Sequence, residues 1–235
     1  MGRRQFKSLL QVRDVPPAAL HQGKPILPDL ADDVYLASEY TFRHKQRLEE
    51  LGLKRLAWSE VLDRLHADLV NGQSKLRTKD SADPWHEAFA RLIITPLRAR
   101  NSSLVTIRDR IKKLALIPLI GGNQWTGAPN TSLGGSKEIY FAFTGTTPIP
   151  KNLSLRLLDK TASQNQTRRL FYKALGVKDC PKETVFAMIK LRHSTVPFSD
   201  GFVDDLRYMY HQEYDLDDIK SWVYVSALFF PVYAA

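Results

Sequence analysis

The chain has a single cysteine, Cys180, among its 235 residues. One cysteine excludes a disulfide within the chain and any metal or redox site made from two neighbouring cysteines. The carboxylate of Asp179 stands next to it in the sequence and disfavours a thiolate. We therefore expect Cys180 to be an inert thiol.

Long apolar runs are missing as well. No run reaches the roughly 18 residues that a membrane-spanning helix needs. The first residues, MGRRQFKSLLQV, lack the apolar stretch of a secretory signal, and Phe6 stands where a myristoylation signal has serine or threonine. We expect an intracellular protein, in the cytoplasm or in the nucleus, without a membrane among its partners.

The familiar nucleotide-binding and catalytic motifs do not occur. A phosphate-binding loop needs GxxxxGK[ST], and Gly134–Lys137 has the composition of that loop in the wrong order and spacing. No GxGxxG sequence is present, and Asp200-Gly201-Phe202 lacks the second glycine of gyrase-like ATPases. A Gly-x-Ser-x-Gly nucleophile elbow is also missing. The sequence predicts a non-catalytic chain without a cofactor.

The histidines give little support for a metal or for acid–base chemistry. Asp63 and His66 are one helical turn apart, a spacing that favours a hydrogen-bonded histidine at the edge of the core over a general base. His86-Glu87 lacks the second histidine of a zinc-binding HExxH motif. The last group is made of alternating residues: His211, Glu213 and Asp215. To form a metal site with two histidines, this group would also need His193. We expect no bound metal.

Enough apolar and aromatic residues are present for a core. The chain is 43% hydrophobic and contains 4 tryptophans, 9 tyrosines and 11 phenylalanines. Its formal net charge of +9 is unevenly distributed, because residues 1–198 carry +14 and residues 199–235 carry −5. A basic body with an acidic end suits a nucleic acid or another anionic partner, and it equally suits a body and tail that pair with each other.

Helical patterns lie on both sides of a short β-rich stretch. The fold class predicted from this order is α+β, mostly helical, with a small antiparallel β insert near residues 115–158. The apolar segment at the end of the chain needs something to pack against, so the chain is either one integrated domain or a fragment of a larger one. The expected regions are a weakly structured N-terminal stretch (1–33), a helical region (34–113), the β insert (114–158) and a second helical region with an apolar C-terminal segment (159–235).

The first helical region is expected to hold three clear helices, the last of which is followed by another that carries part of a basic cluster. One covers 34–51 and ends at Gly52; the next begins near Trp58 with Ser59 as its N-cap and ends by Asn71-Gly72. Asp83-Pro84 is a typical N-cap followed by a proline in the first turn. The helix that follows has the clearest amphipathic pattern of the chain, with one face made of Trp85, Ala88, Phe89, Leu92 and Ile93.

The β insert and the second helical region are expected to follow the same rules. Strands are predicted at 116–120, 139–143 and 153–158, with Pro118, Gly121 and Trp125 fixing a hairpin. Trp85 and Phe89 are expected to build the core with Leu170 and Phe171. Four helices are predicted here. They cover 161–175, a segment that begins at Pro181, 204–210 and 216–222.

Two segments of the chain match at a spacing of 124 residues: Leu51-Gly52-Leu53-Lys54 and Leu175-Gly176-Val177-Lys178. Each is expected to be a helix that a left-handed glycine ends, followed by a linker and a second helix. The linkers run for about six residues, which is longer than the turn of a DNA-reading helix-turn-helix motif. The match therefore indicates an architectural repeat.

A cluster of basic residues follows the amphipathic helix. Lysine and arginine near a helix C-terminus are expected from the helix dipole alone. The cluster contains no interleaved aromatic residue, so base stacking is disfavoured and contact with phosphates is the most it predicts. Its members are Arg98, Arg100, Arg108, Arg110, Lys112 and Lys113.

A series of short motifs appears in a telling order. The pieces are Tyr35–Tyr40, Leu48–Leu53, Trp58–Val61, Asp83–His86, Leu116–Leu119 with Trp125, Ile139–Phe141, Ile149-Pro150, the Ala162/Asn165/Arg168 spacing and Leu175–Val177. In this order they resemble large sacsin-like proteins, especially the fungal ones, in which a chaperone-type ATPase domain precedes long α+β regions.

The resemblance implies a region downstream of the ATPase domain, which scaffolds or couples to neighbouring domains or protein clients in a chaperone-like role. It places no nucleotide-binding residue in this chain. The alternative function is a basic nucleic-acid-binding module that uses the cluster between residues 98 and 113.

Overall fold

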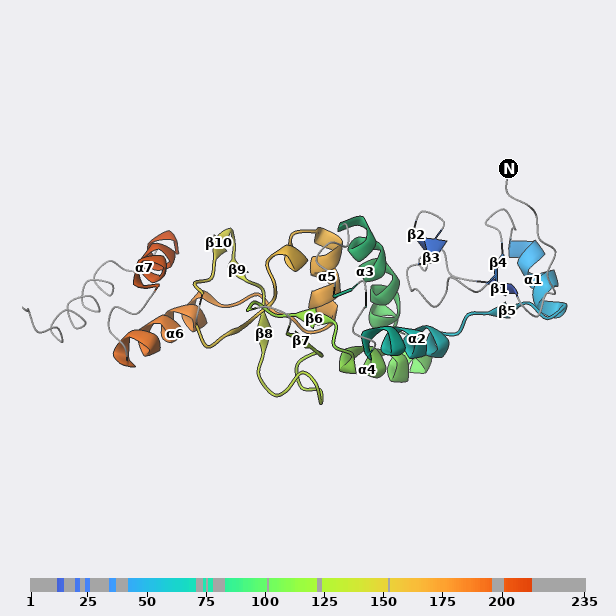
Figure 1. The fold of residues 1–235 in the computed structure, drawn as a ribbon, viewed down its shortest axis with the longest axis horizontal. Coiled ribbons are helices and arrows are strands. Elements are labelled where there is room, and N and C mark those ends of the chain that lie inside the picture. Colours follow the sequence, from blue (N-terminus) through green and yellow to red (C-terminus); the bar gives the residue numbers. More distant parts are fainter. Residues whose placement is uncertain are drawn as a thin grey trace, which may run out of the picture.

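The computed structural model describes residues 12–14, 20–21, 24–25, 34–36, 42–70, 74, 76–77, 83–100, 102–121, 124–151, 153–195 and 201–212. These residues form a mostly helical α+β fold, as predicted, whose elements are spread along a long axis (Figure 1). None of the helices in these ranges is long and apolar enough to cross a membrane.

Seven α-helices lie in the described ranges: α1 (Phe42–Glu50), α2 (Trp58–Val70), α3 (Asp83–Arg98), α4 (Val105–Lys113), α5 (Gln166–Ala174), α6 (Lys182–Thr195) and α7 (Phe202–His211). Two 3-10 helices, η4 (Ser102–Leu104) and η5 (Thr161–Ser163), precede α4 and α5. The short strands are β1 (Val12–Asp14), β2 (Leu20–His21), β3 (Lys24–Pro25), β4 (Val34–Tyr35), β5 (Lys54–Arg55), β6 (Ile117–Pro118), β7 (Trp125–Thr126), β8 (Ile139–Tyr140), β9 (Phe143–Thr144), β10 (Thr147–Pro148) and β11 (Arg156–Leu157).

The N-terminal part differs from the expected helix over 34–51. Val34–Tyr35 is the strand β4, and α1 begins only at Phe42. β4 and β5 flank β1, and both pairs are parallel. A β-branched and an aromatic residue favour the strand at this position, and the pairing with β1 decides it. Most of the predicted weakly structured stretch 1–33 lies outside the described residues, as do the expected helix 216–222 and the apolar segment after it.

The glycine that ends α1 takes the left-handed conformation, as predicted. Gly52 has a φ of 103°. Its N–H donates to the carbonyl of Glu49 at 3.0 Å, and the N–H of Leu53 donates to the carbonyl of Leu48 at 2.8 Å. This is the Schellman arrangement, which satisfies the last carbonyls of the helix and buries the residue after the glycine. Leu53 is accordingly buried.

The same arrangement ends α5, which confirms the repeat. Gly176 has a φ of 98°, and the N–H of Val177 donates to the carbonyl of Tyr172 at 3.0 Å. Leu175 and Val177 are both buried. In each copy the next residue joins a parallel pairing, Lys54 to β1 and Lys178 to Tyr140. The helices that follow, α2 and α6, bury equivalent residues: Val61 and Val185, Leu65 and Ile189.

α2 begins at Trp58, as predicted, but its N-cap lies two residues before the predicted Ser59. Ser59 lies within the helix, and Ala57 occupies the N-cap position, with its carbonyl accepting from the N–H of Val61 at 3.1 Å. The Glu60 side chain accepts a hydrogen bond from the N–H of Ala57 at 3.3 Å. This is the carboxylate half of a capping box: Glu60 satisfies the N–H of Ala57, whereas a serine N-cap would accept from an N–H in the first turn of the helix.

A first core cluster joins α2, α3, α4 and α5. Phe89 of α3 is 1% exposed; it stacks on Trp85, with ring centroids 5.6 Å apart, and meets the edge of Phe171 of α5 at 6.1 Å. The predicted apolar face of α3 therefore packs on α5 through Phe171, as expected, whereas Leu170, the other predicted partner, is half-buried and is not part of this cluster. Leu175 belongs to the same cluster, and Trp125 packs against it.

The β insert contains the expected hairpin. β6 and β7 are antiparallel, with Pro118 opposite Trp125, and Gly121 in the connection has a φ of 110°. β9 and β10 form a second antiparallel pair. β8 and β11 differ from the antiparallel expectation, because they run parallel with Tyr140 opposite Leu157. The β9–β10 hairpin lies between them along the chain.

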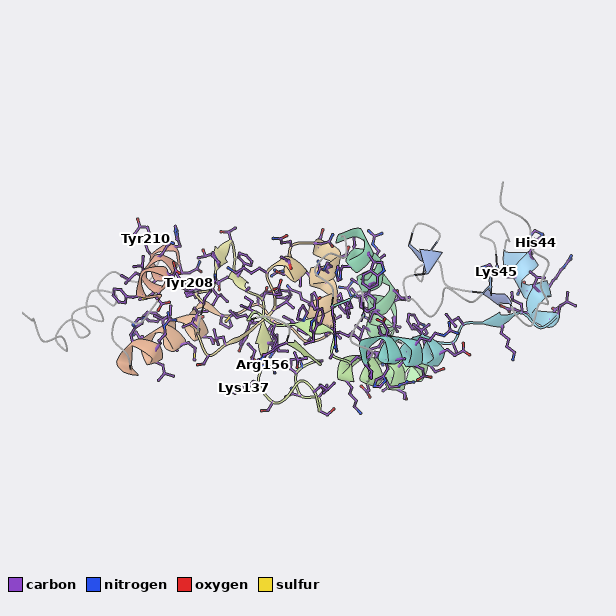
Figure 2. The ribbon with its side chains drawn as sticks, viewed as in Figure 1. His44, Lys45, Lys137, Arg156, Tyr208 and Tyr210 are labelled. Carbon is purple, nitrogen blue, oxygen red and sulfur yellow. The ribbon has the colours of Figure 1, made fainter. Side chains whose placement is uncertain are left out.

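Arg156 of β11 holds the loop between β7 and β8 in place. Its guanidinium donates to Thr126 Oγ1 at 2.9 Å and to the carbonyls of Lys137 and Gly134; Figure 2 shows Arg156 beside Lys137. Gly134 passes so near Ala128 that a Cβ would lie 1.6 Å from its carbonyl oxygen. Glycine is therefore required at position 134 because two backbone segments approach each other closely there. The resemblance of this stretch in composition to a phosphate-binding loop has no part in this.

A second core cluster lies between the β insert and the last two helices. Tyr208 and Met209 of α7 are buried there, and the hydroxyl of Tyr208 donates to Thr144 Oγ1 at 2.8 Å. The cluster consists of Ala142, Ile149, Leu153, Leu157, Cys180, Val185, Ile189, Tyr208 and Met209.

Candidate functional site

The structure separates the predicted basic cluster into two groups. Arg98, Arg100 and Lys113 are exposed, and Lys112 is half-buried. Arg108 instead donates to the carbonyl of Ala99 at 3.0 Å, which fastens α4 to the end of α3. Arg110 donates to the carboxylate of Asp63 at 2.5 Å, and this ion pair joins α4 to α2. Arg108 and Arg110 thus serve the packing of the helices.

A pocket of about 530 Å³ opens between α2 and α4. The two helices pack side by side (Figure 1). Two members of the basic cluster, Arg110 and Lys113, reach this pocket. Its full lining is Leu62, His66, Leu69, Val70, Arg77, Arg110, Lys113, Leu114, Ala115 and Leu133.

The pocket has an apolar floor and a basic rim. Leu62, Leu69 and Leu114 are buried beneath it, whereas Val70 and Leu133 are 69% and 58% exposed at its edge. Among its described lining residues three are cationic and none is acidic. A concave apolar surface with a few positive groups fits a ligand that has an apolar body and an anionic group.

Arg77 provides a hydrogen-bond donor that the described residues leave unused. Its Nε is buried and has no acceptor among them. The N–H of Arg77 donates to the carbonyl of Ser74 at 2.9 Å, and the buried hydroxyl of Ser74 donates to Asp68. The segment after α2 is thus tied to α2 and holds Arg77 at the pocket. A buried N–H without an acceptor is costly, and a carboxylate or phosphate oxygen would satisfy it.

Leu133 reaches the same pocket from a distant part of the sequence. Its carbonyl accepts a hydrogen bond from Thr126 Oγ1 at 2.7 Å, and Thr126 in turn accepts from Arg156. These contacts fix the loop that carries Leu133. Sequence reasoning could not find the pocket, because it combines α2, α4 and this loop.

His66 does not take the role that the sequence suggested. It is exposed and lines the pocket, and the Asp63 carboxylate accepts from Arg110. The predicted pairing of His66 with Asp63 at the edge of the core is therefore wrong. Arg110, on the neighbouring helix, pairs with Asp63 in place of His66 because its guanidinium is always positively charged.

Glu87, adjacent to His86, has a structural role that the sequence did not indicate. Its carboxylate accepts from Arg91, from Asn165 Nδ2 at 3.0 Å and from Thr167 Oγ1 at 3.2 Å. The bond from Arg91, followed by that from Asn165, lowers the pKa of Glu87. The Asn165 side chain also accepts from the N–H of Thr167 at 2.8 Å, as the N-cap of α5. Glu87 therefore joins α3 to the start of α5.

The histidines proposed for a facial triad lie in different environments. His211 is exposed at the end of α7, and Glu213 and Asp215 lie outside the described residues. His193 of α6 is buried, and its Nε2 lies 2.6 Å from Oδ2 of Asp205 on α7. The same carboxylate accepts from Arg192. In the described part of the chain no three histidine, cysteine or acidic side chains lie close enough to hold a metal ion.

Cys180 is buried in the second core cluster. Burial, with a smaller contribution from the charge of Glu138, raises the pKa of its thiol to about 11. The expected cause was Asp179, but that carboxylate pairs with Arg169 and Lys173 of α5. The prediction of a weakly reactive thiol therefore agrees with the structure, but the cause is burial and not the charge of Asp179.

This pKa predicts slow alkylation of the native chain. At pH 8 we expect iodoacetamide to modify Cys180 on the order of 100-fold more slowly in the folded chain than in urea, because only the thiolate reacts and access is blocked. A mass-spectrometric time course measures both rates. Equal rates would show that the thiol is exposed in solution.

No protein-family model, no curated protein and no solved structure matches this chain. The relationship to large sacsin-like proteins therefore stays a prediction that rests on the order of short motifs in the sequence.

Proposed function

We propose that this chain is a non-catalytic interaction module and that the pocket between α2 and α4 binds an apolar segment of a protein partner with an acidic residue at its end. The observation that carries the proposal is the pairing of a leucine floor with a basic rim. In a sacsin-like context the partner would be a neighbouring domain or a protein client. The non-catalytic part of the proposal rests on the motifs that the sequence lacks.

An apolar protein segment fits this pocket better than a nucleic acid. Removal of apolar surface from water stabilises a complex by roughly 25 cal/mol per Å², and the exposed Val70 and Leu133 extend the floor toward solvent. None of the described lining residues is phenylalanine, tyrosine or tryptophan, so the large rings on which bases stack best are not among them. Arg77 and Lys113 would then orient the acidic end and speed association.

Fluorescence anisotropy with the full chain tests the proposal. The probe is a short labelled peptide with leucines followed by aspartates, compared with the same peptide carrying asparagines. We expect Lys113→Glu together with Arg77→Gln to weaken binding of the acidic peptide at least about tenfold, since each charge-assisted hydrogen bond contributes roughly 1.5–3 kcal/mol. Val70→Asp should weaken binding of both peptides.

Arg98→Glu is the matched control, because Arg98 is exposed and does not line the pocket. Unchanged affinity in this variant, with lost affinity in the pocket variants, supports the site. Equal affinities in all variants, or no binding of either peptide, would overturn it. A DNA duplex forms the second arm: salt-sensitive DNA binding that Arg98→Glu weakens, without peptide binding, would favour the nucleic-acid module instead.

A further inference from the structure

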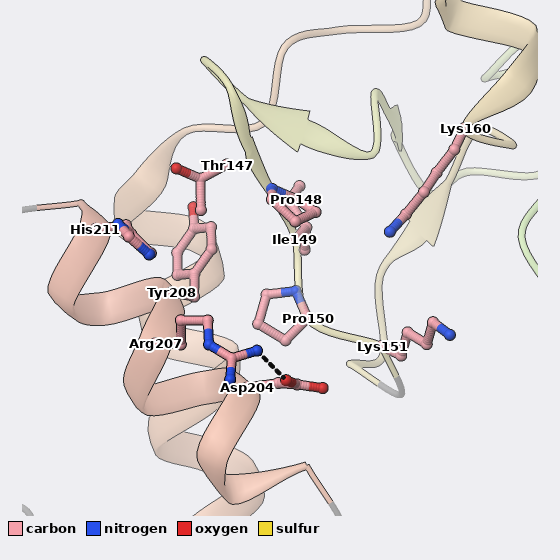
Figure 3. A pocket seen from close by; sticks show the side chains of 10 residues that line it. All are labelled: Thr147, Pro148, Ile149, Pro150, Lys151, Lys160, Asp204, Arg207, Tyr208 and His211. Carbon is pink, nitrogen blue, oxygen red and sulfur yellow. Dashed lines mark hydrogen bonds and ion pairs between the residues drawn. The ribbon is translucent and has the colours of Figure 1, made fainter.

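A second pocket, of about 210 Å³, lies between α7 and the segment that follows β10 (Figure 3). Basic side chains reach it from three stretches of the chain: Lys151 after β10, Lys160 after β11, and Arg207 with His211 on α7. The acidic residue of its lining is Asp204, which pairs with Arg207 at 3.3 Å. The pocket therefore carries a net positive charge.

Contacts outside the pocket restrain the side chain of one of these basic residues and the backbone of another. Lys160 Nζ lies 5.6 Å from the centre of the Phe143 ring, a cation–π contact that restrains its long side chain. The carbonyl of Lys151 accepts from Arg192 Nη1 at 3.0 Å, and Arg192 is bound to the buried carboxylate of Asp205. In Figure 3, Lys160 extends toward Ile149 and Pro150 from the side opposite α7.

Further hydrogen bonds tie α7 to the β9–β10 hairpin, which forms the other wall. Tyr208 donates to Thr144 Oγ1 and Gln212 Nε2 donates to Thr147 Oγ1, both at 2.8 Å. Both walls are thus fixed without a ligand. A site whose walls are held in place loses little conformational freedom on binding.

We propose that this second pocket binds a small molecule that carries a phosphate group. Its volume lies below the roughly 300–1,000 Å³ of sites for drug-sized ligands, which favours a compact ligand over a macromolecule. A phosphate offers several acceptor oxygens and up to two negative charges to donors that arrive from different directions. Arg207 is available for it, because its ion pair with Asp204 is solvent-exposed and such pairs contribute little.

The experiment is a titration of the isotope-labelled full chain, followed by amide chemical shifts at constant ionic strength. The probes are inorganic phosphate and glycerol 3-phosphate, with acetate and chloride as comparison anions. We expect saturable shifts around Lys160 and Arg207 with both phosphates and none with acetate. Tighter binding of glycerol 3-phosphate would show that the apolar wall, which includes Ile149, contacts the organic part; equal binding would identify free phosphate as a sufficient ligand.

Lys160→Glu with Arg207→Glu should weaken phosphate binding at least about tenfold, as expected for the loss of two charged donors. Lys190→Glu is the matched control: Lys190 is exposed on α6, stacks over the Phe186 ring at 4.3 Å and does not line the pocket. If the double reversal does not fold, Lys160→Gln with Arg207→Gln replaces it. Shifts that do not saturate, or equal affinity in the double variant and the control, would overturn the proposal. Peptide binding between α2 and α4 is independent of this result.

Discussion

Replacement of Asp205 by alanine is expected to destabilise the protein by about 3–5 kcal/mol, the usual cost of breaking a buried ion pair by removing one of its partners. Asp205 has no exposed surface, and its Oδ2 accepts from both Arg192 and His193 of α6. The Arg192 side chain is only 13% exposed. Asp205 therefore joins α6 to α7 where water cannot replace the lost contacts.

The state of His193 places most of this effect on the ion pair. Burial, and then the positive charge of Arg192, lower the pKa of His193 below its usual value. A lowered pKa favours the neutral imidazole, which still donates from Nε2 to Asp205. Arg192 also donates to the carbonyl of Lys151, so loss of Asp205 should loosen the wall of the second pocket as well.

Urea unfolding of the full chain measures the effect, and Asp204→Ala is the matched control. Asp204 is the preceding residue, but its side chain is 60% exposed and pairs with Arg207 at the surface. Its removal should cost less than about 1 kcal/mol. The double variant Arg192→Met with Asp205→Ala should be less destabilised than the sum of its single changes, since no buried charge remains unpaired. Equal losses for Asp204→Ala and Asp205→Ala would contradict the buried network.

The two adjacent aspartates show where sequence reasoning stops. The pattern predicts a helix over 204–210, and the structure places α7 over Phe202–His211. Asp205, Tyr208 and Met209 share one face and are all buried. That spacing was the signal that could have marked Asp205, since a carboxylate on an apolar face needs a partner. The identity of the partner depends on how α6 and α7 pack, and no local pattern contains that information.

Prediction from local sequence patterns succeeded where a single residue type determines the backbone conformation. The glycines at 52 and 176 end helices because they take a positive φ at little cost. The apolar face of α3 follows from its helical period. Local patterns failed for Val34 and Tyr35, whose pairing with β1 is a long-range contact. They also missed both pockets, because each pocket combines side chains from separate parts of the sequence. The pocket between α2 and α4, for example, is lined by Arg77 and by a loop that carries Leu133.

Phe89→Ala is the other substitution from which we expect a large loss of stability, about 3–5 kcal/mol, made up of lost burial and of the cavity that remains. Phe89 lies between the stacked ring of Trp85 and the edge of Phe171, and it is 1% exposed. Its neighbours on α3, Leu92 and Ile93, have no exposed surface. The site is enclosed by α3 and α5 and cannot fill the space by small movements of a surface side chain.

Two variants separate the volume of Phe89 from its ring. Phe89→Leu keeps most of the volume and gives up the aromatic contacts, so it should cost about 1–2 kcal/mol. Val203→Ala tests the same kind of truncation at a side chain that is 66% exposed on α7, where the change should stay within about 0.5 kcal/mol. Thermal and urea unfolding should give the order Phe89→Ala, Phe89→Leu, Val203→Ala. If Phe89→Ala unfolds at the same urea concentration as Val203→Ala, α3 does not pack on α5 through this ring in solution. Other contacts must then hold α3, which carries Glu87, against the start of α5.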